Sequence, residues 1–140
     1  MAAEPLSRTI RPDTEAVPEL LDAIEAWCEA HEIGPGVAHR LGVVVEELAA
    51  NVAMHGTGGA DGASFVSLAL HREGDAIHAV VEDDGRPFDP LALAAPDTAA
   101  ALDEREVGGL GVHFARVMTR SLAYAREGGR NRVTAIFDAG

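Results

Sequence analysis

The sequence predicts an α+β fold, a two-layer sandwich in which helices cover one face of a mostly antiparallel sheet. Residues 14–32 and 37–55 carry apolar side chains at helical spacing. Two later segments, 65–82 and 121–138, alternate apolar and polar residues on either side of a short turn. Strands joined by a tight turn pair antiparallel, and amphipathic helices bury their apolar stripes against one face of such a sheet.

The chain begins with a short edge strand and a helix. Residues 7–11 alternate weakly and are expected to form the strand. The helix is expected at residues 14–32. Asp13 or Thr14 can cap its start, and Pro18 falls in the first turn, where proline is tolerated. Its apolar residues recur at intervals of three and four and include Val17, Leu20, Leu21, Ile24, Trp27 and Cys28.

The second helix, expected at residues 37–55, carries a row of polar residues beside its apolar stripe. The stripe consists of Leu41, Val44, Leu48 and Val52. Glu47, Asn51 and His55 are spaced four residues apart, so at about 100° per residue they lie on one face, along the edge of that stripe. Glu46 points closer to the solvent. Because polar groups at the margin of a core often line a site, we single out the row of three.

Two hairpins are expected to supply the rest of the sheet. Their strands are expected at residues 65–71, 76–82, 121–126 and 131–138. Glycine-containing turns at residues 72–75 and 127–130 separate the two strands of each pair. The first hairpin runs into a turn rich in carboxylates at residues 83–90. The element order is therefore strand, two helices, two strands, helix and two strands.

The segment between the hairpins has the composition of a lid. Residues 91–107 are rich in alanine and charge, and we expect short helical pieces that are loosely joined. The glycines at 108–111 open another apolar-periodic stretch that is expected to be a helix. Free N–H groups at the start of a helix can bind an anion.

Composition indicates one domain and excludes several kinds of site. With 140 residues and no low-complexity tract, residues 1–140 are expected to form a single domain. The formal net charge of −12 repels a phosphate backbone, so direct binding to nucleic acid is not expected. Lysine is absent, which excludes a P-loop and an ordinary protein-kinase lysine.

Other features concern the compartment and metal sites. Cys28 is the only cysteine, so no intrachain disulfide can form and a reducing compartment fits. The first residues lack a signal-peptide pattern and no apolar run approaches a membrane span, so we expect a cytoplasmic protein without a membrane contact. The six histidines show no paired ligand spacing with cysteine or carboxylate, so no zinc site is expected.

Three segments occur in a characteristic order: E-x-x-x-N-x-x-x-H on a helix, D-x-G-x-P-F-D after a strand, and G-G-x-G before a helix. With these segments the chain resembles the Bergerat ATP-binding fold of the GHKL superfamily, and most closely the anti-sigma factor serine kinases. The resemblance spans roughly residues 41–137, nearly the whole domain. It implies that ATP and Mg²⁺ bind here and that residues 91–110 form the ATP lid.

The resemblance assigns roles to the polar row of the second helix. It implies that Asn51 is the protein ligand of Mg²⁺, which takes few protein oxygens because phosphates and water supply the others. Glu47 would act as general base for an incoming hydroxyl or orient it. His55 would lie near the phosphates, or alternatively pack or bond to the next loop. The alternative for Glu47 and Asn51 is an ordinary helix with a solvated glutamate and a locally capping asparagine.

The second and third segments would bind the two ends of the nucleotide. By resemblance, the Asp83 carboxylate accepts a proton from the exocyclic amine of adenine. Gly85 lets the backbone approach the base, and Pro87 completes the D-x-G-x-P frame. Asp84 could share the role of Asp83, and a plain Asp-Asp-Gly turn is the alternative. Thr134 matches a small polar residue in the last strands of the family.

The glycine segment would close over the triphosphate. Gly108, Gly109, Leu110 and Gly111 would fold across it and point N–H groups at the phosphates, whereas a plain glycine cluster at a helix start is the alternative. Arg105 lies before these glycines at a position that departs from the family pattern, so solvated surface is favoured for it.

The resemblance implies an ATP-dependent protein-serine kinase that also acts as an anti-sigma factor. Such a protein holds a sigma factor and phosphorylates a STAS-type anti-sigma-factor antagonist. Members of the family commonly form homodimers, which predicts one here. The alternatives are a nucleotide-responsive binding module without kinase activity, the catalytic half of a histidine kinase and a scaffold domain that binds no nucleotide. The histidine kinase is disfavoured because no phosphoacceptor helix pair precedes the domain.

Overall fold

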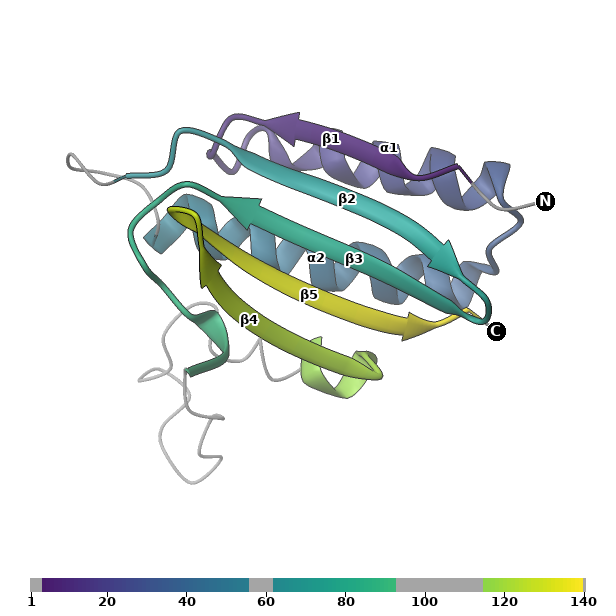
Figure 1. Ribbon diagram of the computed structural model, residues 1–140. Helices are drawn as coiled ribbons and strands as arrows, with labels where there is room; N and C mark the ends of the chain where they lie inside the picture. The colour runs from purple at the N-terminus through teal and green to yellow at the C-terminus, as the bar shows by residue number, and fades with distance from the viewer. Residues whose placement is uncertain (1–3, 56–61, 93–114, 140) are drawn as a thin grey trace, which may run out of the picture.

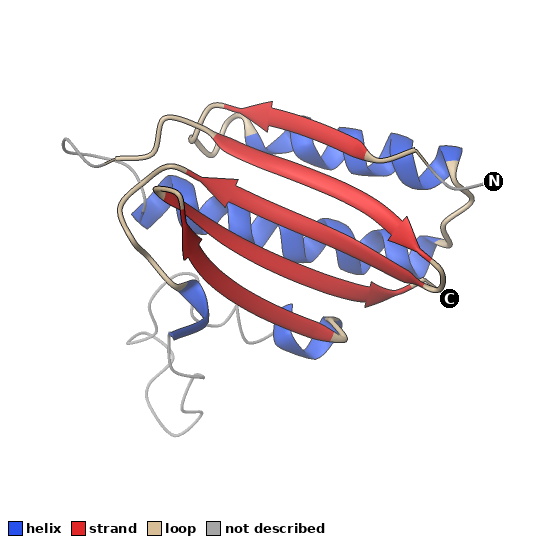
Figure 2. Cartoon of the chain, viewed as in Figure 1, coloured by secondary structure: helices blue, strands red, loops and turns tan. Residues whose placement is uncertain are grey.

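The computed structural model describes residues 4–55, 62–92 and 115–139 as a five-stranded antiparallel sheet with helices on one face. Both long helices lie behind the sheet and run along it, as Figure 1 shows, and Figure 2 shows the same two layers by element type. The predicted fold class, an α+β two-layer sandwich, is confirmed. In chain order the elements are β1 (Leu6–Ile10), α1 (Val17–Ala30), α2 (Pro35–His55), β2 (Val66–Glu73), β3 (Ala76–Asp83), the short 3-10 helix η1 (Pro90–Ala92), β4 (Ser121–Glu127) and β5 (Arg130–Asp138).

The strands of the sheet follow the order β1-β2-β3-β5-β4, and all of the neighbouring pairs are antiparallel. The two predicted hairpins are confirmed, but two-residue turns join β2 to β3 and β4 to β5 in place of the four-residue turns expected at 72–75 and 127–130. Gly74 has a φ of 62°, and Gly128 and Gly129 have φ values of 60° and 75°. Tight hairpin turns require positive φ at these places, which glycine adopts without a steric penalty.

The core lies between the helices and the inner face of the sheet. On α2 the four stripe residues Leu41, Val44, Leu48 and Val52 are all buried. The alternate residues of the central strands meet this stripe, because side chains point to opposite faces along a strand. Those of β3 and β5 include Ile77, Ala79, Val81, Val133, Ala135 and Phe137, all of them buried.

The helix starts differ from the sequence prediction, and α2 begins at Pro35 rather than at residue 37. Helix α1 begins at Val17 rather than at residue 14, and its N-cap is Ala16, which has no side-chain cap. The Asp13 carboxylate instead accepts a hydrogen bond of 2.9 Å from the Ala16 amide, in the turn that precedes the helix. Pro18 lies in the first turn, as expected.

The remaining expectations fall partly outside the described residues. Residues 56–61 after α2, most of the expected lid and the glycine segment 108–111 all lie outside the described ranges. The helix expected after these glycines is present where the description resumes, at residues 115–118. No helix within the described ranges is both long enough and apolar enough to cross a membrane.

Candidate functional site

Helix α2 presents Asn51 to the inside of the molecule. The side chain is 2% exposed, and neither its Oδ1 nor its Nδ2 has a hydrogen-bond partner among the described residues. Leaving a buried polar group unsatisfied costs about 1–3 kcal/mol, so native structures rarely contain one without a functional reason. The amide of Asn51 is therefore suited to a ligand that supplies the missing partners.

The rest of the polar row follows the predicted geometry where it is described. Glu47 lies one turn before Asn51 and is half-buried, whereas Glu46 is exposed, as the helical wheel predicted. His55 is the last residue of α2. Its side chain lies outside the described part of the structure.

Asp83 ends β3 and faces the same interior. Its side chain is 5% exposed, and its Oδ1 accepts hydrogen bonds from the Gly85 amide at 2.8 Å and from Asn131 Nδ2 at 3.0 Å. Burial raises the pKa of this carboxyl and the nearby charge of Asp84 adds to the effect, while both hydrogen bonds and Arg126 oppose it. The two bonds fix the orientation of a carboxylate at the edge of the core.

Asp84 has a different role from its neighbour. Its carboxylate accepts hydrogen bonds from the Ser64 amide at 2.7 Å, the Ser64 hydroxyl and the Phe65 amide at 3.2 Å. Burial acts to raise the pKa of Asp84, but these bonds outweigh it and the pKa is lowered. Asp84 therefore ties the start of β2 to the end of β3, which leaves Asp83 as the carboxylate that faces the interior.

Asn131 is the residue of this region that the sequence analysis missed. It is 4% exposed and stands opposite Asp83 in the pairing of β3 with β5. Besides its bond to Asp83, its Nδ2 donates to the Arg86 carbonyl at 2.8 Å. Its Oδ1 accepts from the Phe88 amide at 3.1 Å and from the Tyr124 hydroxyl at 2.6 Å. One side chain thus holds the carboxylate and the loop that follows it.

The only sequence signal for Asn131 is its place in the alternation of the last strand. Asn131 shares the inner face with Val133, Ala135 and Phe137, and it is the only polar member of that series. A polar residue that continues a buried series has to find partners inside the fold.

The loop between β3 and η1 is fixed by a second contact. The Arg126 guanidinium donates a hydrogen bond of 2.7 Å to the carbonyl of Gly85. Gly85 itself is buried, while Pro87 is exposed. The D-x-G-x-P segment therefore lies against the sheet at its glycine and faces the solvent at its proline.

A narrow cavity joins Asn51 to Asp83. It measures about 10 Å³, and Val52, Val81, Phe88 and Asn131 are among the other residues that line it. This volume has room for about one water molecule. The amide of α2 and the carboxylate of β3 thus share one enclosed space between the layers.

Thr134 is not brought to this space. It lies between the buried residues Val133 and Ala135, and its strand partners are Val80 and Ala123. Because side chains alternate along a strand, Thr134 points to the sheet face opposite the helices. Gly108, Gly109, Leu110 and Gly111 lie outside the described residues.

Comparison with known proteins identifies the family. A family model for the histidine kinase-like ATPase domain matches residues 10–137. The chain belongs to the histidine kinase-like ATPase family. It is also 30% identical over 95 residues to a serine/threonine-protein kinase, BtrW, of Bordetella bronchiseptica. That match spans 67% of this chain and 66% of the relative.

Solved structures show the same fold. The crystal structure of the RsbU and RsbW domains of Rv1364c from Mycobacterium tuberculosis has a TM-score of 0.69 at 14% identity, and the match covers 96% of this chain and 32% of the other. The crystal structure of the SiaB-SiaC complex from Pseudomonas aeruginosa has a TM-score of 0.55 at 18% identity, and the match covers 97% of this chain and 89% of the other. Membership of this ATPase family implies nucleotide binding.

The side chains that line the cavity have the chemistry that a nucleotide and its metal ion require. Mg²⁺ prefers oxygen ligands and keeps most of its coordination shell for phosphate and water, so a single amide oxygen such as Asn51 Oδ1 suffices from the protein. The buried carboxylate of Asp83 is a hydrogen-bond acceptor suited to an amine. The predicted metal ligand and the predicted base-binding carboxylate therefore lie on the helix-covered face of the sheet and line one cavity.

Proposed function

We propose that the protein is an ATP-dependent protein-serine kinase and anti-sigma factor, which phosphorylates a STAS-type anti-sigma-factor antagonist. The observation that carries the proposal is the buried amide of Asn51, without partners among the described residues, in one cavity with the carboxylate of Asp83. The similarity to a serine/threonine-protein kinase supports the choice of reaction. The sequence resemblance to anti-sigma factor kinases supports the choice of partners.

Asp83 would select adenine. Its carboxylate accepts a hydrogen bond from the exocyclic amine of adenine, whereas guanine presents a carbonyl oxygen at the same place and is repelled. The bonds from Gly85 and Asn131 hold the carboxylate in position before the base arrives. A planar base needs more room than the present cavity, so we expect the loop with Phe88 to move outward on binding.

The amide of Asn51 would hold the phosphate end. Its Oδ1 would be the protein ligand for Mg²⁺, and the ion would neutralise charge on the phosphates when bound. Residues 108–111 would add backbone N–H groups, as the sequence resemblance implies. His55 would lie near the same phosphates because it continues the row by one further turn.

Glu47 would act on the attacking hydroxyl. The serine oxygen of the partner attacks the γ-phosphorus, the bond between that phosphorus and the ADP oxygen breaks, and ADP leaves. The carboxylate of Glu47 takes the proton that the serine hydroxyl loses. Glu47 is half-buried one turn from Asn51, so the general base and the metal ligand lie on the same side of α2.

The partners are proteins rather than nucleic acid. A net charge of −12 disfavours contact with a phosphate backbone, so repression would act through the sigma factor and not through DNA. We expect a cytoplasmic homodimer that exchanges the sigma factor for the antagonist according to the bound nucleotide and the phosphorylation of the antagonist.

The test is phosphate transfer from γ-labelled ATP to an antagonist captured from the native cytosol in the presence of ADP. We expect label on one serine of the antagonist. Glu47→Gln should abolish transfer and retain ATP binding, whereas Glu46→Gln, the exposed neighbour, should transfer at the wild-type rate. ATP binding with no label on any captured partner would instead support a nucleotide-responsive binding module, and full transfer by Glu47→Gln would remove Glu47 from the mechanism.

A further inference from the structure

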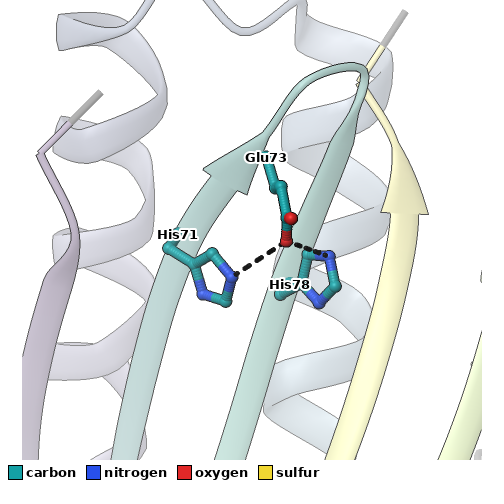
Figure 3. Close-up of side chains that lie close together, drawn as sticks. All are labelled: His71, Glu73 and His78. Carbon is teal, nitrogen blue, oxygen red and sulfur yellow. Dashed lines mark ion pairs between the residues drawn. The ribbon is translucent and has the colours of Figure 1, made fainter. Parts of the chain in front are cut away.

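A second cluster of ligand-type side chains lies on the open face of the sheet, at the end of the β2–β3 hairpin. Figure 3 shows His71 and Glu73 on β2 and His78 on β3, with one oxygen of the Glu73 carboxylate facing both imidazole rings. His71 and His78 are direct partners in the register of the two strands. Glu73 lies two residues after His71, so the period of the strand brings it to the same face.

The three groups are close enough to share one ion. Glu73 Oε2 lies 4.0 Å from His71 Nε2 and 3.7 Å from His78 Nε2. One ligand atom from each of the three residues lies within 4.8 Å of the others. Ligand atoms around a four-coordinate zinc ion are about 3.4 Å apart, given metal–ligand distances near 2.1 Å. Rotation of the imidazole rings about their side-chain torsions would bring the ligand atoms to this spacing.

The two rings lie against each other across the hairpin. The two imidazoles stack with centroids 4.6 Å apart and planes inclined by 16°. The side chain of His78 is 23% exposed, whereas those of His71 and Glu73 are 46% and 76% exposed. A more buried ring thus anchors the cluster, and the other two groups are open to an ion from the solvent.

We propose that His71, His78 and Glu73 form a binding site for a divalent transition metal ion of the zinc type. Two imidazoles and one carboxylate are a ligand set that proteins use for zinc, with the remaining positions filled by water. The net charge of −12 favours the approach of a cation. Sequence spacing alone did not reveal the set, because the two histidines meet only across the hairpin.

This site is separate from the candidate nucleotide site. His78 and Asp83 are five residues apart on β3, about 17 Å at 3.4 Å per residue, and their side chains point to opposite faces. Imidazole also distinguishes the two ions, because Mg²⁺ prefers oxygen ligands whereas zinc accepts nitrogen. The proposal does not depend on the proposed kinase activity.

The test is calorimetric titration of the full chain with ZnCl₂, using protein without a histidine tag that has been stripped with EDTA and desalted. We expect one ion per chain. His71→Ala and His78→Gln should each weaken binding by at least about tenfold, since even residues behind a metal ligand contribute 10–100-fold. His39→Ala, an exposed histidine of α2, is the matched control and should bind like the wild type.

A second measurement guards against variants that lose their fold. Melting in EDTA should give the same transition for each variant as for the wild type, because the side chains lie on the solvent face of the sheet. Addition of zinc should then raise the melting temperature of the wild type and of His39→Ala only. Absence of binding to the wild type, several weak ions per chain, or an affinity equal to that of the wild type in His71→Ala and His78→Gln would overturn the proposal.

Discussion

Asn131 on β5 donates a hydrogen bond of 3.0 Å to Asp83 on β3, its direct partner across the sheet. The same amide also bonds to Arg86, Phe88 and Tyr124. The orientation of the candidate base-binding carboxylate thus depends on a side chain 48 residues away in the sequence. The site is therefore supported by the pairing of β3 with β5 as well as by its own loop.

Asn131→Ala should weaken both the fold and the site. Removal of the amide leaves buried donors and acceptors without their partner, so we expect a loss of about 2–3 kcal/mol in the free energy of unfolding. The affinity for ATP should fall because Asp83 loses its orientation. Urea denaturation and calorimetry measure the two effects. Arg132→Ala is the control: its ion pairs to Glu82 and Glu127 are partly exposed, so we expect a change below about 1 kcal/mol.

Thr134→Val should leave ATP binding unchanged. The residue points to the face of the sheet that the helices do not cover, and valine preserves its shape and its preference for strands. The affinity of the variant for ATP with Mg²⁺, measured by calorimetry, should equal that of the wild type. An affinity for ATP that is tenfold or more below that of the wild type would support the nucleotide contact that the sequence resemblance implied for Thr134.

Much of this site follows from local sequence, and the part that does not has a physical cause. The row of Glu47 and Asn51 beside a buried stripe was predictable because helical periodicity is local. Asn131 was not, because its partners depend on the register between two strands. The assignment of Thr134 depends on which face of β5 it occupies, and neighbouring residues of a strand point to opposite faces. In the structure Thr134 lies on the outer face, and Asn131 is the polar residue on the inner face.

Asp83→Asn should increase stability relative to the wild type as the pH rises, and it should weaken adenine recognition. The pKa of Asp83 is raised in the folded state, chiefly by burial, above its ordinary value of 3.8. A raised pKa means that ionisation disfavours folding: the contribution of Asp83 to stability is fully present below about pH 3.8 and is lost as the pH rises through the folded-state pKa. Asparagine carries no charge and still accepts the bonds from Gly85 and Asn131.

The measurement is urea denaturation of the wild type and of Asp83→Asn between pH 4 and pH 7. As the pH rises, the free energy of unfolding of the variant should increase relative to that of the wild type. Its affinity for ATP at pH 7 should be lower than that of the wild type by at least about tenfold. Asp84→Asn is the matched control. The pKa of Asp84 is lowered, so its ionisation favours folding and the variant should lose stability at pH 7. A constant difference between the wild type and Asp83→Asn would contradict the raised pKa of Asp83.

Asn51→Leu should stabilise the protein without nucleotide and abolish its response to Mg²⁺ and ATP. Both polar atoms of the Asn51 amide are buried and lack partners among the described residues, so an apolar side chain of related shape should remove a cost of about 1–3 kcal/mol. The loss of Oδ1 should remove metal-dependent binding of ATP. Thermal melting with and without Mg²⁺ and ATP measures both effects. A lower melting temperature in the absence of nucleotide would mean that the amide is already satisfied inside the folded protein, and the argument for a ligand at Asn51 would fail.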